Sequence, residues 1–237
     1  MRTAAQFVRA AGEALKPLAD AERAAGMAAY MRGQFTYLGI ATPAHRAAIS
    51  PLIREFRPES VAELRAAVDA LWKKREREYQ YVALGLLSRR NEVLTTDDMP
   101  WLLDLVQQKS WWDTVDALSK PVGAVVRRSG KAGQKQMDKA VLHGNFWVRR
   151  IAMIHQLGWR ADTDTARLFD YARLLAPEKE FFIRKAIGWA LRDYAWHNWQ
   201  AIEAFLAAEG ALFSGLTRRE AAKNIAALRV RPIKNTP

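Results

Sequence analysis

Apolar residues recur along almost the whole chain with the period of an α-helix. In eight segments they fall at positions i, i+3, i+4 and i+7, which places them on one face of a helix. No two alternating runs are joined by an Asn-Gly or Asp-Gly turn, so β-hairpins are not expected. The pattern predicts an all-α protein. The helical segments are FVRAAGEALKPL, MAAYMRGQF, VAELRAAVDALW, WLLDLVQQ, VDALSKPVGAVVRR, VRRIAMIHQL, ARLFDYARLLA and FFIRKAIGWALRDYA.

Short breaks divide these segments into helix pairs that recur at roughly 35 to 45 residues, the spacing of HEAT-type repeats. Sequence similarity between the pairs is low, so a compact helical bundle is the alternative architecture. A solenoid of such repeats would curve and offer a concave face to a long ligand such as a duplex. No linker or shift in composition marks a second domain. We therefore expect residues 1–237 to form one HEAT-like repeat solenoid domain.

Three of the breaks carry residues that are typical of helix starts. Thr42 stands before a proline, as an N-cap residue does when proline opens the helix. Ser110 and Asp113 have the spacing of a capping box, in which two side chains bond backbone N–H groups reciprocally. Thr217 and Glu220 match that box better, because glutamate is the usual second residue. Each of these positions predicts the beginning of a helix.

The chain of 237 residues carries a formal net charge of +12 at pH 7. A surplus of this size favours a polyanionic partner such as a nucleic acid, with a merely soluble basic protein as the alternative. The absence of cysteine excludes disulfides, a thiolate nucleophile, iron–sulfur clusters and cysteine-based zinc sites. No stretch approaches the roughly 20 apolar residues that cross a membrane, and the start lacks the apolar run of a signal peptide. We expect a soluble cytoplasmic protein without a membrane partner.

The first candidate site is the segment KSWWDTVD, residues 109–116. On a helix that starts near Ser110, Trp112 and Asp116 lie on one face. Asp113 lies beside the free N–H groups of the first turn, whereas Asp116 lies a turn deeper and has no capping role. A carboxylate next to indole rings suits the stabilisation of a cation. The alternative is a capped helix whose tryptophans pack into the core.

The second candidate site lies in the segment FFIRKAIGWALR, residues 181–192. Lys185, Trp189 and Arg192 fall at i, i+4 and i+7, so they form one stripe on a helix. The apolar residues between them can supply a separate packing face, which leaves the stripe free to face a ligand. Cationic side chains beside an aromatic ring suit a phosphate backbone and a base or sugar. The alternative is a tryptophan in the core flanked by solvated charges.

Two smaller groups supply further candidates. Of Arg149 and Arg150, one suits a phosphate contact and the other an ordinary surface charge, while Tyr30 lies in an apolar segment where tyrosine is most often a core residue. No motif for nucleotide binding, zinc proteolysis or serine hydrolysis is present. The histidines have no ligand spacing and are expected as surface or partly buried helix residues. We therefore expect no metal ion and no cofactor.

The order and spacing of five segments resemble the AlkD family of alkylpurine DNA glycosylases, which is built from HEAT-like helical repeats. The match extends from about Ala24 to Ile225, and its most specific parts are KSWWDxVD and FFIxKAIGWxLRxYA. The resemblance implies a concave basic face that holds duplex DNA by its backbone and an aromatic cleft that holds the lesion. The five segments are MAAYMRGQFTYLGIATPAHR, KSWWDTVDAL, WVRRIAMIHQL, KEFFIRKAIGWALRDYA and LTRREAAKNI.

The resemblance also implies roles for six residues, all of which keep the residue type of the active branch of the family. Asp116 matches the catalytic aspartate, and Trp112 and Trp189 match the tryptophans of the cleft. The remaining matches are Arg192 with a cleft arginine, Arg150 with a DNA-contacting arginine and Tyr30 with a cleft tyrosine.

The chain departs from the family pattern in three places. Residues 129–139 are richer in glycine and lysine than expected, so the helix boundary there is uncertain from the sequence. A lysine expected near Gly158 is missing, which puts one phosphate contact in doubt. The tail after Ile225 carries no motif of the family.

The implied activity is hydrolysis of the N-glycosidic bond of cationic N3- or N7-alkylated purines, such as 3-methyladenine and 7-methylguanine, in duplex DNA. Such an enzyme needs neither metal nor lysine nucleophile, so a monofunctional glycosylase is expected. We expect it to act as a monomer on the DNA of the cytoplasmic nucleoid. One alternative is a non-catalytic repeat protein that binds DNA structures, which the carboxylate of Asp116 disfavours. The other is a protein-interaction scaffold, which the positive charge disfavours.

Overall fold

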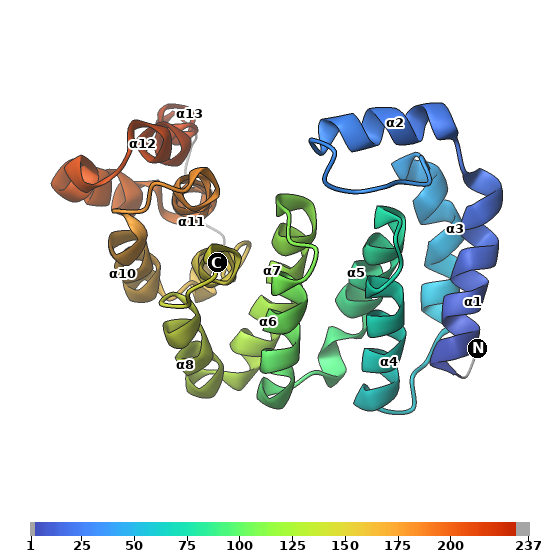
Figure 1. The fold of residues 1–237 in the computed structure, drawn as a ribbon. Coiled ribbons are helices and arrows are strands. Elements are labelled where there is room, and N and C mark those ends of the chain that lie inside the picture. Colours follow the sequence, from blue (N-terminus) through green and yellow to red (C-terminus); the bar gives the residue numbers. More distant parts are fainter. Residues whose placement is uncertain (1–2, 231–237) are drawn as a thin grey trace. The chain divides into compact units, whose positions relative to one another are not determined.

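The computed structural model describes residues 3–230, and Figure 1 shows that they form helices joined by short connections. Apart from an isolated bridge between Thr36 and Glu76, these described residues contain no β-structure. The predicted all-α class is therefore confirmed. No helix among the described residues is both long enough and apolar enough to span a lipid bilayer.

The chain divides between Thr95 and Thr96 into two compact units. The prediction that residues 1–237 form one domain stays a prediction. The first unit contains α1 (Ala4–Leu15), α2 (Ala21–Tyr30), α3 (Thr42–Glu55), α4 (Val61–Trp72) and α5 (Arg77–Arg90). The second contains α6 (Met99–Gln107), α7 (Trp112–Ser129), α8 (Lys131–Ala140), α9 (Phe146–Ile154), α10 (Thr165–Leu175), α11 (Phe181–Glu209), α12 (Gly215–Ala222) and α13 (Ile225–Arg229).

A regular repeat runs through both units. The helices α3, α5, α7, α9 and α11 begin 35, 35, 34 and 35 residues apart, and a further helix precedes each of the last four. Helix pairs at this spacing are what the sequence predicts, so the helical-repeat class is confirmed. We call these five the repeat helices. The more specific HEAT assignment and the concave basic face stay predictions.

The core of the second unit is built around α9. This helix packs against α6, α7, α8, α10 and α11, and Val148, Ile151 and Ala152 are completely buried. The close approach of α7 to the end of α9 depends on Gly123, because a Cβ there would lie 2.1 Å from the carbonyl oxygen of His155. The pairing of α7 with α9 and of α9 with α11 places the first turns of these helices together.

Two predicted capping boxes are wrong. The hydroxyl of Ser110 donates to the carbonyl of Val106 (2.6 Å), and α7 begins only at Trp112, without a side-chain cap. The helix α12 is capped by Ser214, whose hydroxyl accepts from the Thr217 N–H. Thr217 is instead buried inside that helix and donates to a carbonyl of α11. The helix predicted at Thr42 does begin there, although its N-cap residue is Ala41 and makes no side-chain bond.

The glycine-rich stretch at 129–139 contains the one-residue turn between α7 and α8 and most of α8. Gly130, with a φ of 54°, turns the chain between α7 and α8. A Cβ at Gly133 would lie 2.6 Å from the Cα of Val126, so this glycine allows α8 to pack on α7. In the tail, α13 ends at Arg229, and the part after Val230 lies outside the described residues.

One histidine contradicts the expectation of surface or partly buried positions. His155 is only 2% exposed, and its ring lies within hydrogen-bonding distance of the carbonyl of Ala152 (2.7 Å) and of the side chain of Gln134 (3.3 Å). The sequence places it just after an apolar helix, which does not distinguish a capping position from a core position. Burial lowers the pKa of His155 to about 4.

Candidate functional site: an aromatic cleft in the second unit

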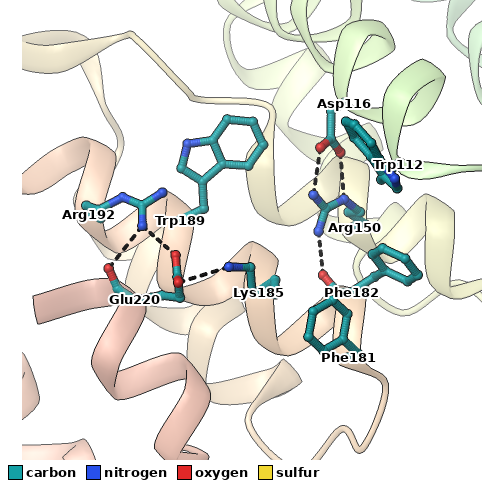
Figure 2. A pocket seen from close by; sticks show the side chains of 9 residues that line it. All are labelled: Trp112, Asp116, Arg150, Phe181, Phe182, Lys185, Trp189, Arg192 and Glu220. Carbon is teal, nitrogen blue, oxygen red and sulfur yellow. Dashed lines mark hydrogen bonds and ion pairs between the residues drawn. The ribbon is translucent and has the colours of Figure 1, made fainter. Parts of the chain in front are cut away.

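The second unit contains a cleft with a volume of about 300 Å³ (Figure 2). Its walls come from the first half of α7, from α9, from the start of α11 and from α12. The cleft brings together six residues that the sequence singles out as candidate site residues and three that it does not name as such. The nine lining residues are Trp112, Asp116, Arg150, Phe181, Phe182, Lys185, Trp189, Arg192 and Glu220.

The first turn of α7 separates two adjacent tryptophans. Trp111 lies before the helix and packs against Trp147 and Phe182, with ring centroids 6.1 and 5.2 Å away. Trp112 is the first residue of the helix and lines the cleft together with Asp116, one turn later. The core-packing alternative therefore applies to Trp111, whereas Trp112 and Asp116 share the cleft face as predicted.

Asp116 forms a bidentate ion pair with Arg150 of α9. The Nε and Nη2 of the arginine donate to its two carboxylate oxygens at 2.6 and 2.8 Å, and the third nitrogen donates to the carbonyl of Phe182. The side chains of Arg150 and Asp116 are 5% and 18% exposed, so the carboxylate is the more accessible partner. Because a carboxylate oxygen can accept two hydrogen bonds and Arg150 donates one to each oxygen, Asp116 retains acceptor capacity.

This pairing changes the interpretation of Arg150. The family resemblance implies that Arg150 contacts DNA, but in the structure all three guanidinium nitrogens have partners within the protein. Its visible effect is to fix the orientation of the Asp116 carboxylate and to offset part of its charge. The phosphate contact stays a prediction.

The stripe predicted on α11 faces the cleft, and a carboxylate from α12 meets it there. Lys185 lies 2.9 Å from one oxygen of Glu220, and Arg192 donates to the other. These two cations, Lys185 foremost, lower the pKa of Glu220. Figure 2 shows this group apart from the Asp116–Arg150 pair, with the indole of Trp189 between them in that view.

Sequence reasoning missed Glu220 as a site residue because the capping-box pattern gave it a local role. The close approach of α12 to α11 makes the contact. A Cβ at Gly188 would lie 2.5 Å from the Cβ of Glu220 and 2.9 Å from the carbonyl oxygen of Thr217. The glycine in KAIGWALR is therefore the one local signal that another helix packs tightly at this point of α11.

The chemistry of the cleft combines aromatic faces with charges of both signs. Four of its nine lining residues are aromatic, three are cationic and two are carboxylates. Aromatic faces attract a flat cation, and a carboxylate stabilises positive charge that develops nearby. Each cation has a carboxylate partner: Asp116 for Arg150, and Glu220 for Lys185 and Arg192.

Two predicted residues are not part of this cleft. Arg149 forms an ion pair with Glu178 (2.7 Å) and donates to the carbonyls of His143 and Gly144. Tyr30 is the last residue of α2 in the first unit and is 74% exposed, so it is not the core residue that base rates favour. Their predicted roles in DNA or lesion binding stay predictions. Within residues 3–230, no three His, Cys, Asp or Glu side chains are grouped so as to hold a metal ion.

A family model and a solved structure that match this chain are both described as DNA alkylation repair enzymes. The family model described as DNA alkylation repair enzyme matches residues 11–225. A solved structure, described as a predicted DNA alkylation repair enzyme from Enterococcus faecalis, is 32% identical with a TM-score of 0.78. The alignment covers 88% of this chain and 97% of that one. No curated protein matches the chain. The extent of the family match shows that the chain belongs to the DNA alkylation repair enzyme family.

Proposed function

We propose that this protein is a monofunctional DNA glycosylase that hydrolyses the N-glycosidic bond of cationic N3- or N7-alkylated purines in duplex DNA. The observation that carries the proposal is the position of Asp116. Its carboxylate lines an aromatic cleft beside Trp112, is oriented by Arg150 and retains acceptor capacity. Membership of the DNA alkylation repair enzyme family supports the substrate class.

The chemistry requires stabilisation of positive charge rather than proton donation. A purine alkylated at N3 or N7 is already cationic, so it leaves without a general acid. As the glycosidic bond lengthens, positive charge develops on the deoxyribose. Asp116 stabilises that charge and helps to position the attacking water. Trp112 and Trp189 hold the cationic base and its sugar through apolar and cation–π contacts, worth roughly 0.5–2 kcal/mol each.

The pairing of the cleft lysine supports the monofunctional part of the proposal. Lys185 is the one lysine that lines the cleft among the described residues, and its ammonium is paired with Glu220. In this scheme Lys185 serves as the charge partner of Glu220 rather than as a nucleophile that attacks the sugar. Water is then the nucleophile, and the product is an abasic site in an intact strand.

The partner in this proposal is duplex DNA, which the net charge of +12 attracts without sequence preference. In this scheme Lys185 and Arg192, which line the cleft, also contact backbone phosphates beside the lesion. We further propose that the protein works as a monomer on nucleoid DNA in the cytoplasm, without a cofactor or metal ion.

The decisive experiment measures base release from a duplex that contains a single 7-methylguanine, with alkali cleavage at the abasic site as the readout. We expect Asp116→Asn to lower the release rate by about 100- to 1000-fold, the usual loss when a preorganised electrostatic group is removed. DNA affinity should stay nearly unchanged, because Arg150, unlike Lys185 and Arg192, is almost fully buried and stays bonded to the carbonyl of Phe182, so loss of its carboxylate partner does not expose it to phosphate.

The matched control is Asp113→Asn, which makes the same chemical change on the same helix outside the cleft lining. Full release by this control and loss in Asp116→Asn would establish the role of the carboxylate. Equal release by both variants would contradict it. DNA binding without release from 7-methylguanine or 3-methyladenine by the wild type would favour the non-catalytic alternative.

A further inference from the structure

Every cation that lines the cleft is matched by a carboxylate, and one of these carboxylates has no place in the chemistry described so far. Glu220 reaches from α12 to both Lys185 and Arg192, two cations that lie seven residues apart on α11. Its side chain is 18% exposed, while those of Lys185 and Arg192 are 37% and 21% exposed. The carboxylate is therefore the most enclosed member of the group.

The packing of α12 against α11 holds Glu220 next to Lys185 and Arg192. Gly188 allows the Cβ of Glu220 to approach the backbone of α11. The hydroxyl of Thr217, one turn earlier on α12, donates to the carbonyl of Arg184 on α11 (3.1 Å). These two features fix the rotation of α12 so that Glu220 points at the stripe of cations.

Two requirements of the proposed substrate conflict at this place. A phosphate backbone favours cations near the lesion, whereas a cationic base is repelled by uncompensated positive charge. Asp116 already offsets Arg150 on one side of the cleft. Without Glu220, Lys185 and Arg192 would stand uncompensated beside Trp189, on which a cationic base would stack.

We propose that Glu220 is a specificity-determining residue that compensates Lys185 and Arg192, so that the cleft admits a positively charged base while keeping both cations in place. This inference rests on the proposed glycosylase function. It makes two carboxylates responsible for different charges: Asp116 for the charge that develops on the sugar, and Glu220 for the charge that the base already carries.

The test uses Glu220→Gln, which preserves size and hydrogen bonding and removes the charge. Release of 7-methylguanine at saturating enzyme should fall by about tenfold, because the cationic base now meets two uncompensated cations. Affinity for an undamaged duplex should rise, and the slope of log K against log salt should become steeper by about one unit. A merely structural role of Glu220 predicts instead that release and binding both weaken, together with a lower melting temperature.

The matched control is Glu209→Gln, which removes the same charge from an ion pair with Arg173 at the far end of α11, outside the cleft lining. It should leave both release and salt dependence unchanged. A second control removes the proposed target: in a Lys185→Gln background, Glu220→Gln should steepen the salt slope less than it does in the wild type, because coupled residues are not additive.

The outcomes separate this inference from the proposed function. Undamaged-duplex affinity and salt slope do not depend on catalysis, so they test the compensation even if the wild type releases no base. Wild-type release of 7-methylguanine with no change of either quantity in Glu220→Gln would overturn the inference and leave the glycosylase proposal intact.

Discussion

The same position of the repeat helices lines a hollow in each unit, but the residues at that position differ between the units. The fifth residues of the five repeat helices are Arg46, Tyr81, Asp116, Arg150 and Lys185. The last three line the aromatic cleft of the second unit. The first two line a groove of about 680 Å³ between α3 and α5 of the first unit. Equivalent positions in the repeat thus contribute to both hollows.

The difference lies in how positive charge is balanced. The groove of the first unit is lined by Arg46, Arg54 and Arg89, and none of the described carboxylates lines it. In the cleft of the second unit every cation faces a carboxylate, and two indoles complete the wall. Unopposed arginines suit phosphates, which bring their own negative charge. Opposed cations beside aromatic rings suit a ligand that is itself cationic.

The largest expected effect on stability tests the ion pair of Asp116 with Arg150 in the second unit. Arg150→Ala leaves Asp116 enclosed without its partner and also empties the space of the side chain. We expect the free energy of unfolding to fall by about 3–5 kcal/mol, measured by urea denaturation. The same change at an unopposed arginine, Arg89→Ala, should cost no more than about 0.5 kcal/mol, because that side chain is exposed.

If Arg150→Ala and Arg89→Ala lower the free energy of unfolding equally, the two units do not differ in how their arginines are balanced. If Arg150→Ala remains stable and instead flattens the salt dependence of DNA binding by about one unit, Arg150 is the DNA-contacting arginine that the family resemblance implies.

The second expected effect is a loss of stability in acid, and it depends on the buried His155 at the end of α9. Burial lowers the pKa of His155 to about 4, whereas an unfolded histidine has a pKa near 6.5. Between these values the unfolded chain binds the proton and the folded chain does not, so stability rises with pH. The residue should cost nothing above pH 6.5 and about 3 kcal/mol once the pH falls below 4.

The measurement is urea denaturation at pH 7, 5.5 and 4.5 for the wild type and for His155→Gln. The variant should show a flatter decline of the unfolding free energy with acid, even if it starts lower. His143→Gln changes an exposed histidine and should follow the wild type. Identical slopes for His155→Gln and the wild type would contradict a neutral buried imidazole.

These contrasts also explain how far the sequence leads. The pairs that share a helix face were predictable, because Trp112 with Asp116 and Lys185 with Trp189 depend only on local periodicity. The ion pair of Asp116 with Arg150 joins two helices that are 34 residues apart, and no local pattern specifies it. The relation between the two units is likewise outside what periodicity can show.

Glu220 illustrates a different limit, since a local rule pointed to the wrong role. Thr217 and Glu220 have the spacing of a capping box, but Ser214 stands three residues earlier and has the same capacity to cap. Capping patterns are short and therefore recur by chance inside helices. Only the packing of α12 on α11 reveals which serine or threonine opens the helix and where the glutamate points.

The smallest expected effect tests the groove of the first unit. Arg46→Gln and Arg89→Gln each remove one cation that no lining carboxylate opposes. Each should flatten the slope of log K against log salt for an undamaged duplex by about one unit, because one fewer phosphate is neutralised. The rate of base release at saturating enzyme should not change, since neither residue lines the cleft.

The matched control is Arg9→Gln on α1 of the same unit, where the arginine is 75% exposed and pairs with Glu13. It removes the same formal charge outside the groove. If all three variants flatten the slope equally, the net charge of the unit governs binding and the groove has no special part in it. If only the two groove variants respond, the repeat face of the first unit grips the backbone, and the division of labour between unopposed and opposed cations holds.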